Sequence, residues 1–197
     1  LDSCVLYDDG LMTSVYYSVF VDFYPDNGHL YRSGSDDSVG MFVMRHNTEG
    51  DLEWVETPDG PENDDTTMAM AFDRRRLPYL YVTGGFKDTV SFGPYEITSE
   101  GQRDIFVAKY SLYGGLVWLK TLGGTGEEES SDIVVDADGN IYYMGRFGSA
   151  EIDFDLSEEG EHIVERQGGM DFFISKLDEY GGHEWTKTWD GVTSHSR

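Results

Sequence analysis

The most suggestive chemical motif in the sequence is a run of oxygen-bearing side chains, Asp136-x-Asp138-Gly139-Asn140. Carboxylates at alternate positions of a tight loop converge on Ca²⁺, which prefers oxygen ligands. The distal Glu that completes a calcium loop at about position 12 is missing, because Phe147 stands there. Asp-Gly-Asn is also a strong signal for a hairpin turn. We therefore expect a turn here and keep calcium as the alternative.

A second pair of carboxylates, Asp153 and Asp155, lies on one side of an expected extended segment and offers the same chemistry. A solvated acidic loop is the simpler interpretation. His183-Glu184 begins like a helical zinc motif, but Lys187 stands where the second His belongs. We therefore expect no metal site and no cofactor, with calcium left open. The histidines share no spacing and are expected at surfaces and turns: His29, His46, His162, His183 and His195.

The sequence predicts no catalytic site, and it leaves any ligand-binding residues unknown. Its 38 Asp and Glu residues allow a carboxylate pair for glycoside hydrolysis, yet no pair stands out from a surplus that also makes a soluble surface. Cys4 has no neighbouring feature that would activate its thiol, and lipidation of Cys4 is a minor alternative. The basic cluster at 74–76 is expected at an exposed turn tip, with docking to an acidic partner as the alternative.

Composition narrows the classes of partner. The chain has 197 residues, 14 Lys and Arg and a net charge of −24, which is the wrong sign for holding nucleic acid or an anionic membrane. No apolar run is long enough for a transmembrane helix. The hydrophobic share of 39% and the aromatic share of 14% suffice for a packed core. Because 24 glycines fall mostly between short runs of Val, Ile, Phe and Tyr, the composition indicates a β-rich fold.

The elements that position these residues recur along the chain, which is typical of repeat proteins. Trp54, Trp118 and Trp185 are separated by 64 and 67 residues, and a turn glycine stands four residues before each. Alternating apolar and polar residues precede each of these turn glycines. Earlier in each unit, a turn is followed by a strand that contains an aromatic residue and ends at Gly34, Gly84 or Gly145. Alternation at period two predicts half-buried strands, and Asp-Gly or Asn-Gly predicts tight turns. Each unit is therefore expected to hold two hairpins.

The expected strands are four per unit, and helix should be scarce. The first unit is expected to cross from its second to its third strand in the few residues from 34 to 40, whereas the later units use long connections. The expected strands lie at 16–23, 29–33, 41–46 and 51–56, then 66–73, 79–85, 103–110 and 115–121, then 131–137, 140–146, 170–177 and 183–189.

Repeated four-stranded antiparallel units with one Trp each predict an all-β fold, a β-propeller. A β-sandwich is the alternative, but it requires no such period. Three blades do not close a ring, which takes about four to eight. The remaining blades are therefore expected from the rest of a longer chain or from self-association. We expect about three complete blades plus a partial blade at the N-terminus, as a partial blade at 1–15, blades at 16–60, 61–124 and 125–191, and a lead-in to a next blade at 192–197.

Aromatic side chains are expected in two roles. The three repeated tryptophans should pack between blades. Trp189 has no counterpart in the other units and, together with Tyr143 and Phe147, is expected at a rim where a ring can stack on sugar.

Three segments, 104–110, 114–124 and 134–142, carry a more specific pattern. At these residues the chain resembles the SBBP β-propeller repeats of bacteria, a family related to the NHL repeats. The resemblance covers about 65–197 and is weaker over 16–60. The chain departs from the pattern in its first connection and at 74–76, where the usual Asp-Gly-Asn turn is replaced. The resemblance implies a non-enzymatic module, secreted or displayed on the cell surface, that serves as a binding or scaffold unit.

Three functions of different classes follow from this sequence. The leading one is a non-catalytic extracellular propeller module that binds protein or glycan through its loops, because the strands are committed to packing. The second is a carbohydrate-active propeller enzyme, which the fold by itself does not decide. The third is a structural surface-layer or assembly subunit whose acidic surface responds to salt or divalent cations.

Overall fold

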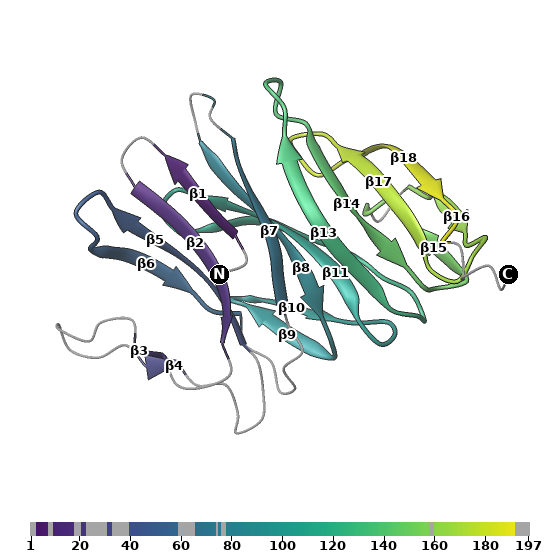
Figure 1. The fold of residues 1–197 in the computed structure, drawn as a ribbon, viewed down its shortest axis with the longest axis horizontal. Coiled ribbons are helices and arrows are strands. Elements are labelled where there is room, and N and C mark those ends of the chain that lie inside the picture. The colour runs from purple at the N-terminus through teal and green to yellow at the C-terminus, as the bar shows by residue number, and fades with distance from the viewer. Residues whose placement is uncertain are drawn as a thin grey trace, which may run out of the picture.

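Short apolar strands and glycine turns give the chain an all-β structure. The computed structural model describes residues 3–7, 10–17, 21–22, 31–32, 40–58, 66–73, 75, 78–157 and 160–191, with side chains in 41–58, 69–73, 75, 78–157 and 160–191. Three four-stranded antiparallel sheets stand side by side in an open arc (Figure 1). The described residues contain no helix. The predicted all-β, propeller-type fold is confirmed.

Each sheet follows the chain from one edge to the other, so that consecutive long strands are neighbours. The first strands of adjacent sheets, β1, β7 and β13, lie next to one another. The first sheet contains β1 (Ser3–Tyr7), β2 (Gly10–Tyr17), β5 (Gly40–Asn47) and β6 (Leu52–Glu56). The middle sheet contains β7 (Thr66–Asp73), β8 (Tyr79–Phe86), β11 (Asp104–Ser111) and β12 (Leu116–Leu122). The third sheet contains β13 (Glu128–Val135), β14 (Ile141–Phe147), β17 (Asp171–Leu177) and β18 (His183–Trp189).

A small hairpin is inserted between the second and third strands of every sheet. The three hairpins are β3 (Val21–Asp22) with β4 (Tyr31–Arg32), β9 (Thr89–Phe92) with β10 (Tyr95–Thr98), and β15 (Glu151–Asp153) with β16 (Ile163–Glu165). The later two cover equivalent phenylalanines of the third strands. Phe92 lies 5.0 Å from Phe106, and Phe154 lies 5.0 Å from Phe173, between ring centroids.

The expected strands of the first unit are wrong in their first half. The hairpin of β1 and β2 belongs to the same sheet as β5 and β6, so it is not part of a preceding blade. The expected strands at 16–23 and 29–33 correspond mainly to the inserted hairpin β3–β4. The first hairpin was assigned to the wrong residues because the Asn-Gly at 27–28 resembles the turn of the later units. In the structure, the pair Tyr7 and Gly10 closes the first hairpin. The connection between second and third strands is therefore long in all three units.

The later units agree with the expected positions, since β7 to β12 lie within 61–124 and β13 to β18 within 125–191. Residues 192–197, expected as a lead-in, lie outside the described residues, as do His29, His195, Arg74 and Arg76.

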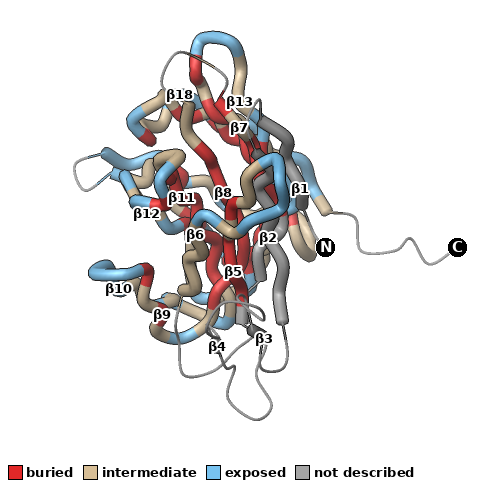
Figure 2. The backbone as a smooth tube through the Cα atoms, turned by 90° about the vertical axis from the view of Figure 1, so that its left-hand side faces the viewer, coloured by how far each residue is buried: buried red, intermediate tan, exposed pale blue. Residues whose placement is uncertain are grey.

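Two apolar layers hold the three sheets together, and buried residues run through the centre of each (Figure 2). Met41 and Val43 pack with Leu80, Val82 and other side chains of the middle sheet in one layer. The opposite face of the middle sheet forms the second layer with the third sheet. This second layer contains Tyr81, Ile105, Val107, Ile133, Ile141, Tyr143 and Phe173. The middle sheet is therefore buried on both faces, as a blade inside a propeller must be.

The turn glycines and tryptophans form one repeated contact between sheets. Gly50, Gly114 and Gly181 have φ values of 92°, 83° and 84°, the left-handed conformation that favours glycine. Trp54 and Trp118 pack against the two apolar layers, as expected for residues between blades. Trp185 is 36% exposed, because none of the described sheets lies on its side.

The expected aromatic rim is wrong. Tyr143 is 1% exposed and Phe147 is fully buried, so both belong to the layer between the middle and third sheets. Trp189 is 57% exposed and lies opposite Phe172 on the other face of the third sheet. The period of two places Trp189 and the two buried rings on opposite faces.

Candidate functional site

The Asp136 motif forms a self-contained turn. Oδ1 of Asp136 accepts the backbone N–H groups of Asp138 and Asn140, at 2.9 Å each, and Oδ2 accepts the Asn140 amide at 2.8 Å and the Tyr142 hydroxyl at 3.1 Å. Partial burial acts to raise the pKa of Asp136, but these hydrogen bonds outweigh it and lower the pKa to about 2. Both carboxylate oxygens have protein donors, as expected for the hairpin turn.

Asp153 and Asp155 organise the loop after β15. Asp153 Oδ1 accepts the N–H groups of Asp155 at 2.9 Å and His162 at 2.7 Å, and Asp155 Oδ1 accepts that of Ser157 at 3.0 Å. The hydroxyl and N–H of Ser157 lower the pKa of Asp155. The ring of His162 lies 4.6 Å from that of His183, between centroids. Within the part of the chain that the structure describes, no three His, Cys, Asp or Glu side chains are arranged to hold a metal ion.

Arg75 is not an exposed turn tip, as the sequence predicts, but a bridge to the third sheet. Its guanidinium contacts both oxygens of the buried Asp73 at 2.8–3.0 Å, the Asp138 carbonyl at 2.7 Å and the Glu179 carboxylate at 2.9 Å. A Cβ on Gly139 would lie 2.0 Å from the Arg75 guanidinium, so glycine is required for this close approach. The planar guanidinium is suited to several acceptors at once. The basic cluster therefore joins two sheets through Arg75.

A cleft of about 570 Å³ opens between the end of β10, the start of β11, the segment after β12 and the β15–β16 hairpin. Thr98, Thr121, Thr125 and Ser157 supply hydroxyls to its wall. None of the described residues that line it is Lys or Arg. Five carboxylates from both units line the cleft: Glu100, Asp104, Glu151, Asp153 and Asp155.

Asp104 is the buried member of this set. Its side chain is 2% exposed and accepts the N–H of Glu100 at 2.8 Å, while Oδ1 has no partner among the described residues. Burial raises the pKa of Asp104 to about 6, and the carboxylates of Glu128 and Glu100 add to the effect. Glu128 is fully buried, and burial raises its pKa as well, although the hydroxyl and N–H of Ser149 bind it. The cleft therefore contains a buried carboxylate whose pKa is raised.

Like charges also face each other at the rim. Glu151 and Glu165 are paired directly across the β15–β16 hairpin. Two carboxylates at opposed positions of a hairpin repel each other. A cationic ligand in the cleft would relieve this repulsion.

Comparison with known proteins supplies one distant relative. No known protein-family profile matches the chain. An uncharacterized WD repeat-containing protein, L264 of Acanthamoeba polyphaga mimivirus, is 25% identical over 137 residues. The match covers 66% of this chain and 9% of that protein. It agrees with the propeller-type repeat seen in the sheets, and the resemblance to the SBBP and NHL repeats stays a prediction.

Sequence reasoning found Asp153 and Asp155 but missed the rest of the cleft. Glu100 lies in the loop after β10, and Glu151 begins β15 in the next unit. Nothing in their spacing shows that the two units bring them together. Asp104 could have been found from the sequence, because Asp171 occupies the same position at the start of the third strand of the next unit. Among the described residues there is no helix long and apolar enough to cross a membrane.

Proposed function

We propose that this chain is a non-catalytic propeller-type interaction scaffold that binds a basic segment of a protein partner in the acidic cleft. The observation that carries the proposal is a set of five carboxylates, with no Lys or Arg among the described lining residues, around a cleft of about 570 Å³. Clefts of about 300–1,000 Å³ hold small ligands or a few side chains. The name of the WD repeat-containing relative supports a repeat scaffold.

Electrostatics favours Lys or Arg side chains as the bound groups. Charge-assisted hydrogen bonds between a guanidinium or ammonium and a carboxylate are among the stronger polar contacts. The net charge of −24 attracts a cationic partner at long range and speeds its association. We place this module outside the cell or at its surface, on the strength of the repeat resemblance alone, and glycan is the alternative ligand there.

The test is binding of a fluorescent oligo-arginine peptide, measured by anisotropy, with an oligo-glutamate peptide of equal length as the negative probe. The variant Glu100→Gln with Glu151→Gln removes one exposed charge from each side of the cleft. We expect about a 3–10-fold loss of affinity, since exposed charge contacts contribute up to about 1 kcal/mol each. The matched control, Glu96→Gln with Asp138→Asn, removes two exposed charges outside the cleft lining. An equal loss of affinity in the control would mean that the peptide is bound by general attraction to the net charge and not by the cleft.

A carbohydrate-active enzyme is the second candidate, favoured by the raised pKa of Asp104 and Glu128. Against it, Glu128 is fully buried, and backbone N–H groups bind both carboxylates. Hydrolysis of an aryl glycoside, abolished in Asp104→Asn, would establish this alternative.

A further inference from the structure

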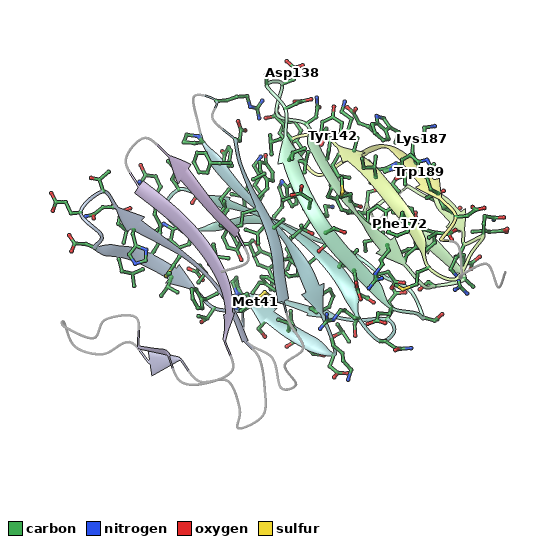
Figure 3. All side chains as sticks on the ribbon, viewed as in Figure 1. Met41, Asp138, Tyr142, Phe172, Lys187 and Trp189 are labelled. Carbon is green, nitrogen blue, oxygen red and sulfur yellow. The ribbon has the colours of Figure 1, made fainter. Side chains whose placement is uncertain are left out.

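The third sheet exposes a large apolar face on the side away from the middle sheet. Strand pairing places Tyr142, Met144, Phe172, Lys176, Trp185 and Trp189 on this side, which we call the open face. Met144 is 40% exposed, Phe172 54% and Trp189 57%. Figure 3 shows Tyr142, Phe172, Lys187 and Trp189 gathered on this sheet. A contiguous patch of exposed apolar side chains marks an interaction surface.

The equivalent face of the middle sheet is buried. Ile105 stands at the position of Phe172, and Leu122 at that of Trp189. Ile105 is fully buried and Leu122 is 1% exposed, because the third sheet covers them. The open face therefore has the character of a sheet-to-sheet contact whose second sheet is not supplied by the described residues.

A polar contact accompanies each covered face. In the first sheet, Arg45 Nη1 and Trp54 Nε1 both donate to the Leu112 carbonyl, in the β11–β12 turn of the middle sheet, at 3.4 and 2.7 Å. In the middle sheet, Lys109 Nζ donates to the Glu179 carbonyl, at the same position of the next β17–β18 turn, at 2.8 Å. The contact therefore repeats from sheet to sheet.

The turn glycines complete this contact. A Cβ on Gly114 would lie 3.0 Å from the Trp54 ring, and one on Gly181 would lie 3.5 Å from Trp118 and 3.4 Å from Lys120. Gly114 and Gly181 are accordingly buried. Each tryptophan holds the turn of the following sheet.

The third sheet carries the same donors. Lys176 and Trp185 pair across β17 and β18, as Arg45 and Trp54 pair across β5 and β6. Lys176 also forms an ion pair with Glu184, as Arg45 does with Glu53. Since Arg45 keeps its ion pair while it contacts the next turn, the Lys176–Glu184 pair does not block the same contact.

The matching turn lies at the other end of the molecule. Gly50 has the same left-handed backbone as Gly114 and Gly181, but it is exposed, and no described residue lies within 4 Å of its Cβ position. The Thr48 carbonyl occupies the sequence position of the acceptors Leu112 and Glu179. Glu49 and Asp51 make this turn acidic, and the exposed Lys187 lies on the open face, opposite Ile174 in the strand pairing.

We propose that the open face binds the first sheet of a second copy of this chain, with Gly50 seated on Trp185 and the Thr48 carbonyl accepting from Lys176. The contact continues the series already present twice within the chain. It is heterologous, so one dimer contains it twice when the two chains close on each other. Two copies of the three described four-stranded sheets give six, which is within the usual range of about four to eight blades.

The first test is the solution mass by light scattering over a range of concentrations. We expect 44.4 kDa, twice the chain mass of 22.2 kDa, and a return to the single-chain mass in Phe172→Ser with Trp189→Ser. The matched control is Tyr95→Ser, which removes a ring that is 51% exposed on β10, and it should stay dimeric. Circular dichroism of each variant checks that the fold is kept.

A charge exchange tests the orientation of the two copies. Lys187 stands at the position of Lys120, beside the next turn glycine, so it should lie near Glu49 of the second copy. Lys187→Glu and Glu49→Lys should each weaken the dimer, and the double variant should restore it. A wild-type mass of 22.2 kDa at all concentrations would overturn the proposal, as would a dimer that none of these changes affects.

Discussion

The middle and third sheets carry the same repeat, yet equivalent residues have different surroundings. Asp104 begins β11 and Asp171 begins β17, and both are buried, with 2% and 1% exposure. The pKa of Asp104 is raised to about 6 by burial and by the nearby Glu128. Burial also acts to raise the pKa of Asp171, but three backbone N–H groups bind its carboxylate and lower it. Neighbouring groups, not repeat position, therefore set the ionisation.

The turns between first and second strands differ in the same way. Asp73 is buried against Arg75, which continues to the third sheet. Asp136 is half-buried and accepts hydrogen bonds from residues 138–142 of its own hairpin. The turn of the middle sheet stabilises a contact with its neighbour, whereas that of the third sheet stabilises itself.

The largest expected effect tests whether the two apolar layers are equally important. Phe106 faces the first sheet and Phe173 faces the middle sheet, at equivalent positions. Phe106→Ala and Phe173→Ala should each lower the free energy of unfolding by about 3–5 kcal/mol, since each removes a buried ring. Urea denaturation measures both, with Leu at the same positions as the milder control. A much smaller loss at Phe173 would mean that the third sheet opens independently.

The next effect tests the contrast between the turns. Arg75→Ala leaves the buried Asp73 without its cation and should cost about 2–3 kcal/mol, because a buried unpaired charge is expensive. Asn140→Ala removes one hydrogen bond to the half-exposed Asp136 and should cost about 1 kcal/mol. Urea denaturation at neutral pH measures both losses of stability, and Arg75→Lys should show an intermediate loss. Equal losses would contradict the bridging role of Arg75.

The last effect is a difference in pH dependence. The native pKa of Asp104, about 6, exceeds the ordinary value of 3.8, so the native state binds more protons and loses stability as pH rises between these values. The free energy of unfolding of Asp104→Asn, relative to that of the wild type, should therefore rise by about 1–3 kcal/mol between pH 4 and pH 7. One pKa unit corresponds to about 1.4 kcal/mol.

Asp171→Asn should behave in the opposite sense. Because the native pKa of Asp171 is lowered, this residue stabilises the fold at pH values above the ordinary pKa of Asp. The contribution is lost as pH falls through the native pKa. The variant should be less stable than the wild type at pH 7 and approach it in acid. Thermal denaturation from pH 3 to pH 7 measures both variants. Parallel pH profiles would show that the two aspartates share one environment.

Much of the fold could be predicted from local pattern. The turn glycines and alternating strands of the second and third units lie where expected, because period-two alternation and left-handed glycine are local properties. The first unit failed because two turn signals, at 8–10 and 27–28, compete for the same role. Pairing with β5 decides between them, and pairing is a long-range property.

The sequence by itself determined the strands and turns of the second and third units, the acidity and the three-fold repetition of Trp and Gly. Only the tertiary structure decided which of those equivalent residues are covered. Trp54 and Trp118 contact a following turn, while Trp185 contacts no such turn among the residues that the structure describes. Glu100 and Glu151 line one cleft although they belong to different units. The physical reason is that burial and charge interactions depend on distances between sheets, which the repeat pattern of one sheet does not contain.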